Sequence, residues 1–163
     1  MDDIPLSALV GALIFLLLVS GFFSGSETGL MSLNRYRLRH LVDKKIRSAM
    51  RAQNLLAAPE KLIGLILLGN NFVNILASAI ATIIGMRLFG EPGILVATIT
   101  LTVVVLIFAE VTPKTLAALH PERFALPAAL ILQPMLKLLY PVVWLVNLAT
   151  RGIFKIQGLR QIL

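Results

Sequence analysis

The chain has 163 residues, a length that fits one domain, and 58% of these residues are apolar. Charged residues make up only 14%, about half of the roughly 25% that is typical of soluble domains. With a mean hydropathy of +0.89, this composition predicts a membrane domain. The absence of cysteine excludes disulfides, thiolate metal sites and thiol nucleophiles, and two distant histidines do not supply a zinc site.

The net charge of +7 could indicate a nucleic-acid-binding protein, so the positions of the basic residues decide their meaning. Eight of the fifteen lie between Arg35 and Lys61, flanked on both sides by apolar segments. Lys and Arg gather in the cytoplasmic loops of membrane proteins, beside anionic lipid headgroups. We therefore interpret the charge as a topology signal and expect no nucleic-acid partner.

The first apolar segment predicts a membrane-spanning helix over residues 4–31. Residues 4–23 are uncharged, and twenty helical residues are about 30 Å long, the thickness of the hydrocarbon core. A cleavable signal peptide is disfavoured because Asp2 and Asp3 replace its usual positive charge, and because Phe22 and Phe23 stand where small residues are needed. We expect the acidic N-terminus to lie outside the cell.

The next segments alternate between polar and apolar character. Residues 35–58 combine many basic residues with apolar residues at helical spacing, which predicts an amphipathic segment at the cytoplasmic membrane surface. Residues 62–86 and 93–119 predict the second and third spans. Between them, Gly90 and Pro92 are typical of a short turn.

The last apolar stretch, residues 124–150, is ambiguous because it carries Lys137 at its centre and three prolines. A crossing would place Lys137 near the bilayer midplane, at a cost of roughly 3 kcal/mol or more. It would also leave Arg151 and Arg160 outside the cell, against the positive-inside rule. We therefore predict an all-α membrane domain with three transmembrane helices, cytoplasmic amphipathic helices and a proline-bent juxtamembrane belt helix, followed at 151–163 by a cytoplasmic linker.

Each predicted span carries polar residues, and intramembrane polar groups are candidates for function by default. They lie at Ser24–Gly25–Ser26–Glu27 in the first span, at Asn70, Asn74 and Ser78 in the second, and at Glu110 in the third. Counted from basic or histidine residues at the cytoplasmic boundary, Ser26, Asn70 and Glu110 all come out about 13 to 15 Å deep. The three clusters are therefore expected to share one level near the midplane.

Breaks in the helical backbone are predicted at the same level. Pro113 has no N–H to donate to the carbonyl of Ala109, and Gly25 and Gly29 favour a looser first helix. Hydroxyls, amide oxygens, free carbonyls and one carboxylate make an all-oxygen set, which suits magnesium, calcium or sodium and does not suit zinc or copper.

Structural alternatives remain open for these residues. Glu110 could pair with Lys114 at i+4 in a resting state, which would not exclude ion binding. The stripe of Asn70, Asn74 and Ser78 could serve only to join two helices by hydrogen bonds. Glu27 could be a second carboxylate of the cavity or a cap at a helix break, and we favour the structural role.

Three motifs resemble the transmembrane domain of CorC/CNNM magnesium transporters. They are FFSGSETGLMSLNR at 22–35, LGNNFVNI at 68–75 and AEVTPKT at 109–115, in the order found in that family. Gly25 and Gly29 stand where relatives often have alanine, which leaves the polar ligands intact. The similarity covers essentially the whole chain.

The resemblance implies transport of Mg²⁺, coupled to Na⁺, at a site where the three motifs meet. It assigns the cation to Ser24, Ser26, Asn70, Asn74 and Glu110, with backbone at Gly25 and around Pro113; the polar stripe adds Ser78. It also implies a homodimer, a bacterial inner membrane location with a cytoplasmic C-terminus, and a cytoplasmic CBS-domain pair that binds ATP. This chain has no such pair, and we expect it to be the membrane domain of a longer protein.

Two other functions remain open at this stage. A sodium or proton pathway that does not carry magnesium could use the same Glu110 and polar stripe. A non-transporting sensor or partner-binding domain would use Asn70 and Asn74 for packing alone. We expect no enzyme, because the sequence has no HExxH pair, no phosphate-binding glycine loop and no convincing Ser-His-Asp set.

Overall fold

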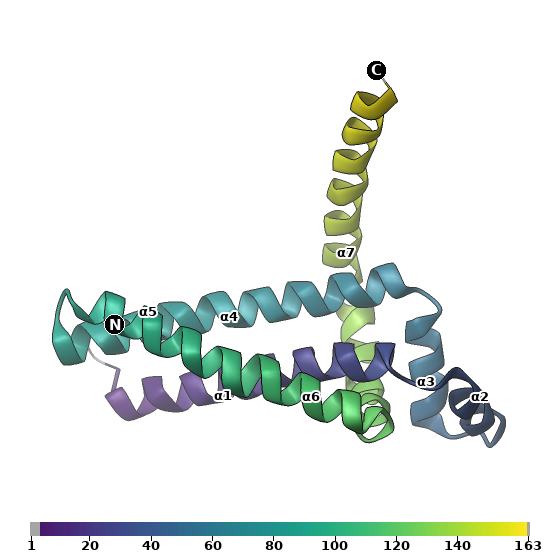
Figure 1. Ribbon diagram of the computed structural model, residues 1–163, viewed down its shortest axis with the longest axis horizontal. Helices are drawn as coiled ribbons and strands as arrows, with labels where there is room; N and C mark the ends of the chain where they lie inside the picture. The colour runs from purple at the N-terminus through teal and green to yellow at the C-terminus, as the bar shows by residue number, and fades with distance from the viewer. Residues whose placement is uncertain (1–3, 163) are drawn as a thin grey trace.

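The computed structural model describes the backbone of residues 4–162 and the side chains of residues 4–156. Asp2, Asp3 and the side chain of Arg160, on which part of the expected orientation depends, lie outside these described residues. The described chain is helical throughout, without a strand, as predicted (Figure 1). Its elements are α1 (Leu6–Met31), α2 (Arg35–Asp43), α3 (Arg47–Leu56), α4 (Pro59–Phe89), α5 (Gly93–Val104), the π-helix η1 (Val105–Val111), α6 (Thr112–Leu119) and α7 (Pro121–Ile162).

Three long rods lie side by side and form the body of the molecule (Figure 1). The first is α1, the second is α4, and the third is the continuous run α5–η1–α6 over Gly93–Leu119. They contain 26, 31 and 27 residues, so each is about 39 Å long or more and exceeds the hydrocarbon thickness of about 30 Å. All three are long and apolar enough to cross a membrane.

The helix α1 is the central element of the bundle. It packs against α4 on one side and against η1 and α6 on the other, whereas in the described chain α4 packs against neither η1 nor α6. The third rod reaches α4 only through α5. A site that joins residues of α4 to residues of η1 would therefore lie beside α1, which packs against both.

The contact between α4 and α5 depends on two glycines. A Cβ at Gly93 would lie 1.9 Å from the carbonyl oxygen of Gly85, so only glycine lets the two backbones approach this closely. The chain reverses just before, where Gly90 has a φ of +72° and Pro92 follows. This turn agrees with the connection predicted between the second and third spans.

The predicted amphipathic segment 35–58 folds as two helices, α2 and α3, at one end of the bundle (Figure 1). Asn34 caps α2, because its Oδ1 accepts hydrogen bonds from the backbone N–H groups of Tyr36 and Arg37. The chain breaks between the helices at Lys45, whose φ is +60°. Apolar residues of α3 such as Leu55 and Leu56 are buried, so the amphipathic pattern reflects a real packing face.

The helix α7 lies across the bundle, transverse to the three rods (Figure 1). It begins at Pro121 and ends at Ile162, so it extends the predicted 124–150 belt helix and continues through the segment expected to be a linker. Three prolines lie inside it. Pro134 cannot bond to the carbonyl of Leu130, and the Arg51 guanidinium from α3 donates to that oxygen instead, at 2.9 Å.

Length and composition alone would allow α7 to be a fourth span. Its residues Pro121–Ile156 are apolar enough to cross a membrane, which makes four such helices in the described chain. Hydropathy therefore does not decide between three and four crossings. The direction of α7, transverse to the three rods, is the structural feature that distinguishes it from them.

Candidate functional site

A cluster of three side-chain oxygens joins α1 to α4. The Oγ atom of Ser20 lies 2.8 Å from Oδ1 of Asn70 and 2.8 Å from Oδ1 of Asn74. Ser20 is completely buried, and the two asparagines are half-buried. Because a hydroxyl has a single proton, Ser20 can donate to only one of the two amide oxygens at a time. The excess of acceptors is relieved if one amide turns its NH₂ group inward or if a cation binds.

The predicted serines of α1 lie next to this cluster, and their hydroxyls differ. Ser24, one helical turn from Ser20, is 1% exposed, and its Oγ has no hydrogen-bond partner in the described structure. Ser26 is completely buried, but its Oγ donates to the carbonyl oxygen of Phe22 in the same helix, at 2.5 Å. Ser24 is thus the serine whose hydroxyl remains available to a ligand.

The third predicted motif lies in a π-helix. Glu110 is part of η1, which ends just before Pro113, and the N–H of Thr112 bonds to the carbonyl of Ile107, five residues back. Pro113 has no N–H, and in the i+5 register of this wide turn the carbonyl that it leaves without a donor is that of Phe108, whereas the i+4 register of the prediction gave Ala109. Gly21 of α1 sits directly on this region, because a Cβ there would lie 3.2 Å from Cγ of Pro113 and 3.6 Å from the carbonyl oxygen of Phe108.

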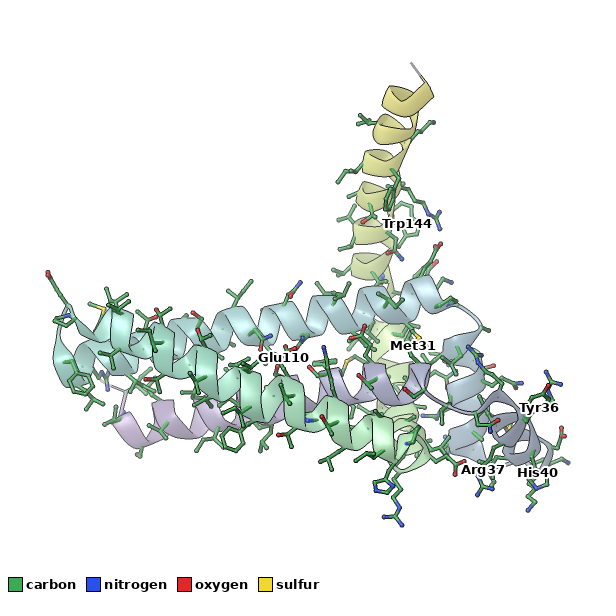
Figure 2. The ribbon with its side chains drawn as sticks, in the orientation of Figure 1. Met31, Tyr36, Arg37, His40, Glu110 and Trp144 are labelled. Atoms are coloured by element: carbon green, nitrogen blue, oxygen red, sulfur yellow. The ribbon has the colours of Figure 1, made fainter. Side chains whose placement is uncertain are left out.

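Glu110 pairs with Lys114 in this structure, as the structural alternative proposed. Nζ of Lys114 lies 3.4 Å from Oε2 of Glu110, and both side chains remain partly exposed, at 47% and 31%. Figure 2 shows Glu110 midway along the bundle. No described hydrogen bond or ion pair connects Glu110 to Ser20, Asn70 or Asn74.

Two other polar residues do not join the cluster. Ser78 is exposed, and its carbonyl accepts a bond from the hydroxyl of Thr82 within the same helix. Eight residues along an α-helix leave a rotation of about 80°, so a residue at i+8 turns away from Ser20 while Asn74 at i+4 still faces it. Glu27 is half-buried and lines a cleft with Lys114, and no described hydrogen bond or ion pair joins it to Ser20, Asn70 or Asn74.

The sequence prediction missed Ser20 and Gly21. Ser20 lies exactly one turn before Ser24, so extending the i−4 row of α1 beyond the motif would have found it. Gly21 has the same relation to Gly25. Ser20 lies inside the uncharged run, between Val19 and Gly21, so no polar neighbour marks it in the sequence.

Replacing Ser20 with alanine is expected to destabilise the fold, because the Oδ1 atoms of Asn70 and Asn74 then lose their described donor. The loss should be about 1 kcal/mol or more, visible as a lower unfolding temperature of the purified protein in detergent. Ser26→Ala is the matched control, since the carbonyl of Phe22 keeps the backbone N–H of its own helix. Equal unfolding temperatures for Ser20→Ala and wild type would contradict the role of Ser20.

Comparisons with known proteins agree on one family. The family model of the cyclin M transmembrane N-terminal domain matches residues 11–162. The UPF0053 inner membrane protein YfjD of Escherichia coli is 55% identical over 142 residues, which cover 87% of this chain and 33% of that protein. A UPF0053 protein of Haemophilus influenzae is 51% identical over 160 residues, 98% of this chain and 38% of that protein. A chloroplastic DUF21 domain-containing protein of Arabidopsis thaliana is 34% identical over 148 residues, 89% of this chain and 22% of that protein.

Proposed function

Because the chain belongs to the family of the cyclin M transmembrane N-terminal domain, we propose that it carries Mg²⁺ across the membrane through a site at the centre of its helical bundle. It is a multi-pass membrane domain, and it spans about a third of the length of the bacterial relatives it matches. The three motifs that resemble magnesium transporters are the reason for choosing this ion among hard cations.

One observation carries the proposal: three oxygens of Ser20, Asn70 and Asn74 meet in the bundle with a single hydroxyl proton between them. The unpartnered hydroxyl of Ser24 adds a fourth oxygen one turn away on the same helix. Buried polar atoms in native structures are nearly always satisfied, so an orphan beside an excess of acceptors favours a cation ligand. Neutral oxygen ligands suit Mg²⁺ and Na⁺, and do not suit zinc or copper.

The charge for a divalent ion comes from Glu110 in this proposal. Its carboxylate pairs with Lys114 here, so an arriving cation must compete with the ammonium group for the same oxygen. The close contact of Gly21 with the π-helix brings η1 next to the serine-bearing segment of α1. Release of Glu110 from Lys114 would let its carboxylate turn toward Ser24 across that contact.

Hydration limits how the ion can be held. Mg²⁺ gives up its waters reluctantly and usually keeps several in proteins. The five proposed side-chain oxygens, with that of Glu110 included, and the freed carbonyl near Pro113 would fill all six positions of an octahedral shell, so a retained water would have to take the place of one of them. Coupling to Na⁺ is part of the proposal, because the neutral oxygens of Ser20, Asn70 and Asn74 suit a monovalent cation as well.

Replacing Glu110 with Gln tests the charged ligand, because it keeps the shape and removes the charge. Binding of Mg²⁺ to the purified protein, measured by titration calorimetry, should weaken at least tenfold, equivalent to about 1.4 kcal/mol. Asn74→Ala should weaken binding less, since an amide oxygen contributes a dipole and no net charge. Uptake of Mg²⁺ into proteoliposomes should fall in parallel.

Two results would refute this assignment. Wild-type protein that takes up Na⁺ but no Mg²⁺ would favour a sodium pathway. A folded Glu110→Gln protein that binds Mg²⁺ with wild-type affinity would leave Glu110 as the structural partner of Lys114 only.

We further propose three crossings, with α7 lying along the cytoplasmic face of the membrane. The helix runs transverse to the three rods, and Lys137 at its centre is exposed (Figure 1). Arg151, in the C-terminal half of α7, forms an ion pair with Glu60 in the first turn of α4, with 3.2 Å between Nη2 and Oε2. Helices α2 and α3, with their basic residues, lie at the same end of the bundle. The positive-inside rule then places this end in the cytoplasm.

Single cysteines test this topology cleanly, since the chain has none of its own. In intact cells, a cysteine at Glu91, in the turn between α4 and α5, should react with a membrane-impermeant maleimide. A cysteine at Arg151 should react only after the cells are opened. Labelling at 151 in intact cells would establish a fourth crossing through α7.

We also propose a homodimer, together with a cytoplasmic CBS-domain pair that binds ATP in the full-length protein. The dimer rests on the family resemblance and on symmetry, since twofold dimers are the commonest assemblies of identical soluble chains. A further domain is consistent with the coverage, since this chain matches only 33% and 38% of the lengths of the two bacterial relatives. Native mass measurement in mild detergent should give twice the mass of the 17.8 kDa chain. A monomer that still binds Mg²⁺ would contradict the dimer.

A further inference from the structure

The ring of Phe124, near the start of α7, lies directly on the backbone of Gly25 in α1. A Cβ placed on Gly25 would be 2.3 Å from Cε1 and 2.5 Å from Cζ of that ring. Heavy atoms do not approach this closely, so the ring occupies the space where any other side chain at position 25 would begin. Gly25 itself is buried between Ser24 and Ser26.

A second glycine extends the same contact by one helical turn. At Gly29, a Cβ would be 3.4 Å from the backbone nitrogen of Ala125, from Cβ of Phe124 and from the carbonyl oxygen of Pro121. The first turn of α7 is therefore pressed against α1 at Gly25 and Gly29. These contacts lie on the half of α1 that leads to α2 and α3, beyond Ser24 as seen from Ser20.

The start of α7 is held in this position from outside the bundle as well. Glu122, two residues before Phe124, forms an ion pair with Arg37 of α2. The chain enters α7 directly from α6 through His120, so Phe124 lies less than two turns from the end of the third rod. The start of α7, which carries the ring, is thus held by α2, by α6 and by α1.

We propose that Phe124 is a positioning residue that closes the Ser24 end of the cation site and keeps it free of water. This inference rests on the proposed function, because it assigns a wall to the site through which the ion is proposed to pass. The hydroxyl of Ser24 is 1% exposed and unpartnered, and the ring stands on the residue next to it. Removing the ring opens a path to Ser24 from the side of α2 and α3.

Reactivity of a cysteine at position 24 tests this closure without any ion. In the chain carrying Ser24→Cys, a small water-soluble methanethiosulfonate should react slowly, because the thiol is enclosed. Adding Phe124→Ala should raise the rate at least tenfold, and Phe124→Leu, which still fills most of the space, should leave the rate low. Phe154→Ala is the matched control on the same helix, since that ring is 66% exposed and should change nothing.

Two further cysteines separate opening of the site from loosening of the fold. Ser32→Cys, at an exposed position past the end of α1, should react quickly in every background. Ala77→Cys, completely buried in α4, should stay protected when Phe124 is replaced. If Phe124→Ala leaves the rate at position 24 unchanged, or raises the rate at position 77 equally, Phe124 does not close the site.

Gly25→Ala supplies a second test that does not depend on the larger cavity. The added methyl group must displace the ring, so it should raise the rate at position 24 when Phe124 is present and have little effect together with Phe124→Ala. If Gly25→Ala and Phe124→Ala each multiply the reaction rate at position 24 independently, the ring does not act through its contact with Gly25. All these reaction rates are measured without Mg²⁺. The closure by Phe124 can therefore be refuted while the wild-type protein still takes up Mg²⁺, and the closure can be supported while Mg²⁺ uptake is not observed.

Discussion

The polar and small residues of α1 between Ser20 and Gly29 have to be covered, and the rest of the fold follows from how they are covered. A hydroxyl exposed to hydrocarbon without a partner costs several kcal/mol, and a helix with glycines on its surface offers little packing area of its own. Each neighbour covers one part of this segment: α4 brings Asn70 and Asn74 to Ser20, η1 and α6 lie on Gly21, and α7 lies on Gly25. The central place of α1 is a consequence of these contacts.

Close packing on α1 also explains why the proposed ion ligands come from different neighbours of this helix. The asparagines approach from α4 and Glu110 approaches from η1, and these two elements do not pack against each other in the described chain. In this structure Lys114 neutralises Glu110 while the neutral oxygens bond among themselves. In the proposed site, the negative charge of Glu110 is therefore held apart from the neutral oxygen ligands.

Much of the fold could be predicted from the sequence, because hydropathy and charge act over whole segments. The three long rods, the turn at Gly90 and the amphipathic face of α3 follow directly from them. The length of α7 did not, since the apolar stretch ends before Arg151, where a linker was predicted, while the helix continues to Ile162. The bond from Arg51 to the carbonyl freed by Pro134 shows how a tertiary contact compensates for a proline inside a helix.

The candidate site was predicted less completely, because its geometry depends on helix rotation and on contacts between helices. Spacing identified Asn70 and Asn74, but it also included Ser78, which the drift of an α-helix turns away. Ser20, Gly21 and Phe124 carry no motif of their own, and only the packing on α1 gives them a role. The depth estimate placed Ser26 and Glu110 at one level, yet depth alone could not show that Ser26 bonds to its own helix.

The central claim is that one cation is held on the polar face of α1 by ligands from both neighbouring rods. The most direct measurement is an experimental structure of the protein with Mn²⁺ in place of Mg²⁺, in which anomalous scattering locates the metal, since Mn²⁺ prefers the same oxygen ligands. The account predicts a single strong peak inside the bundle, within coordination distance of Ser24 and Asn74, with Glu110 released from Lys114. A peak only at the surface, or a bundle without metal in which Glu110 still pairs with Lys114, would contradict it.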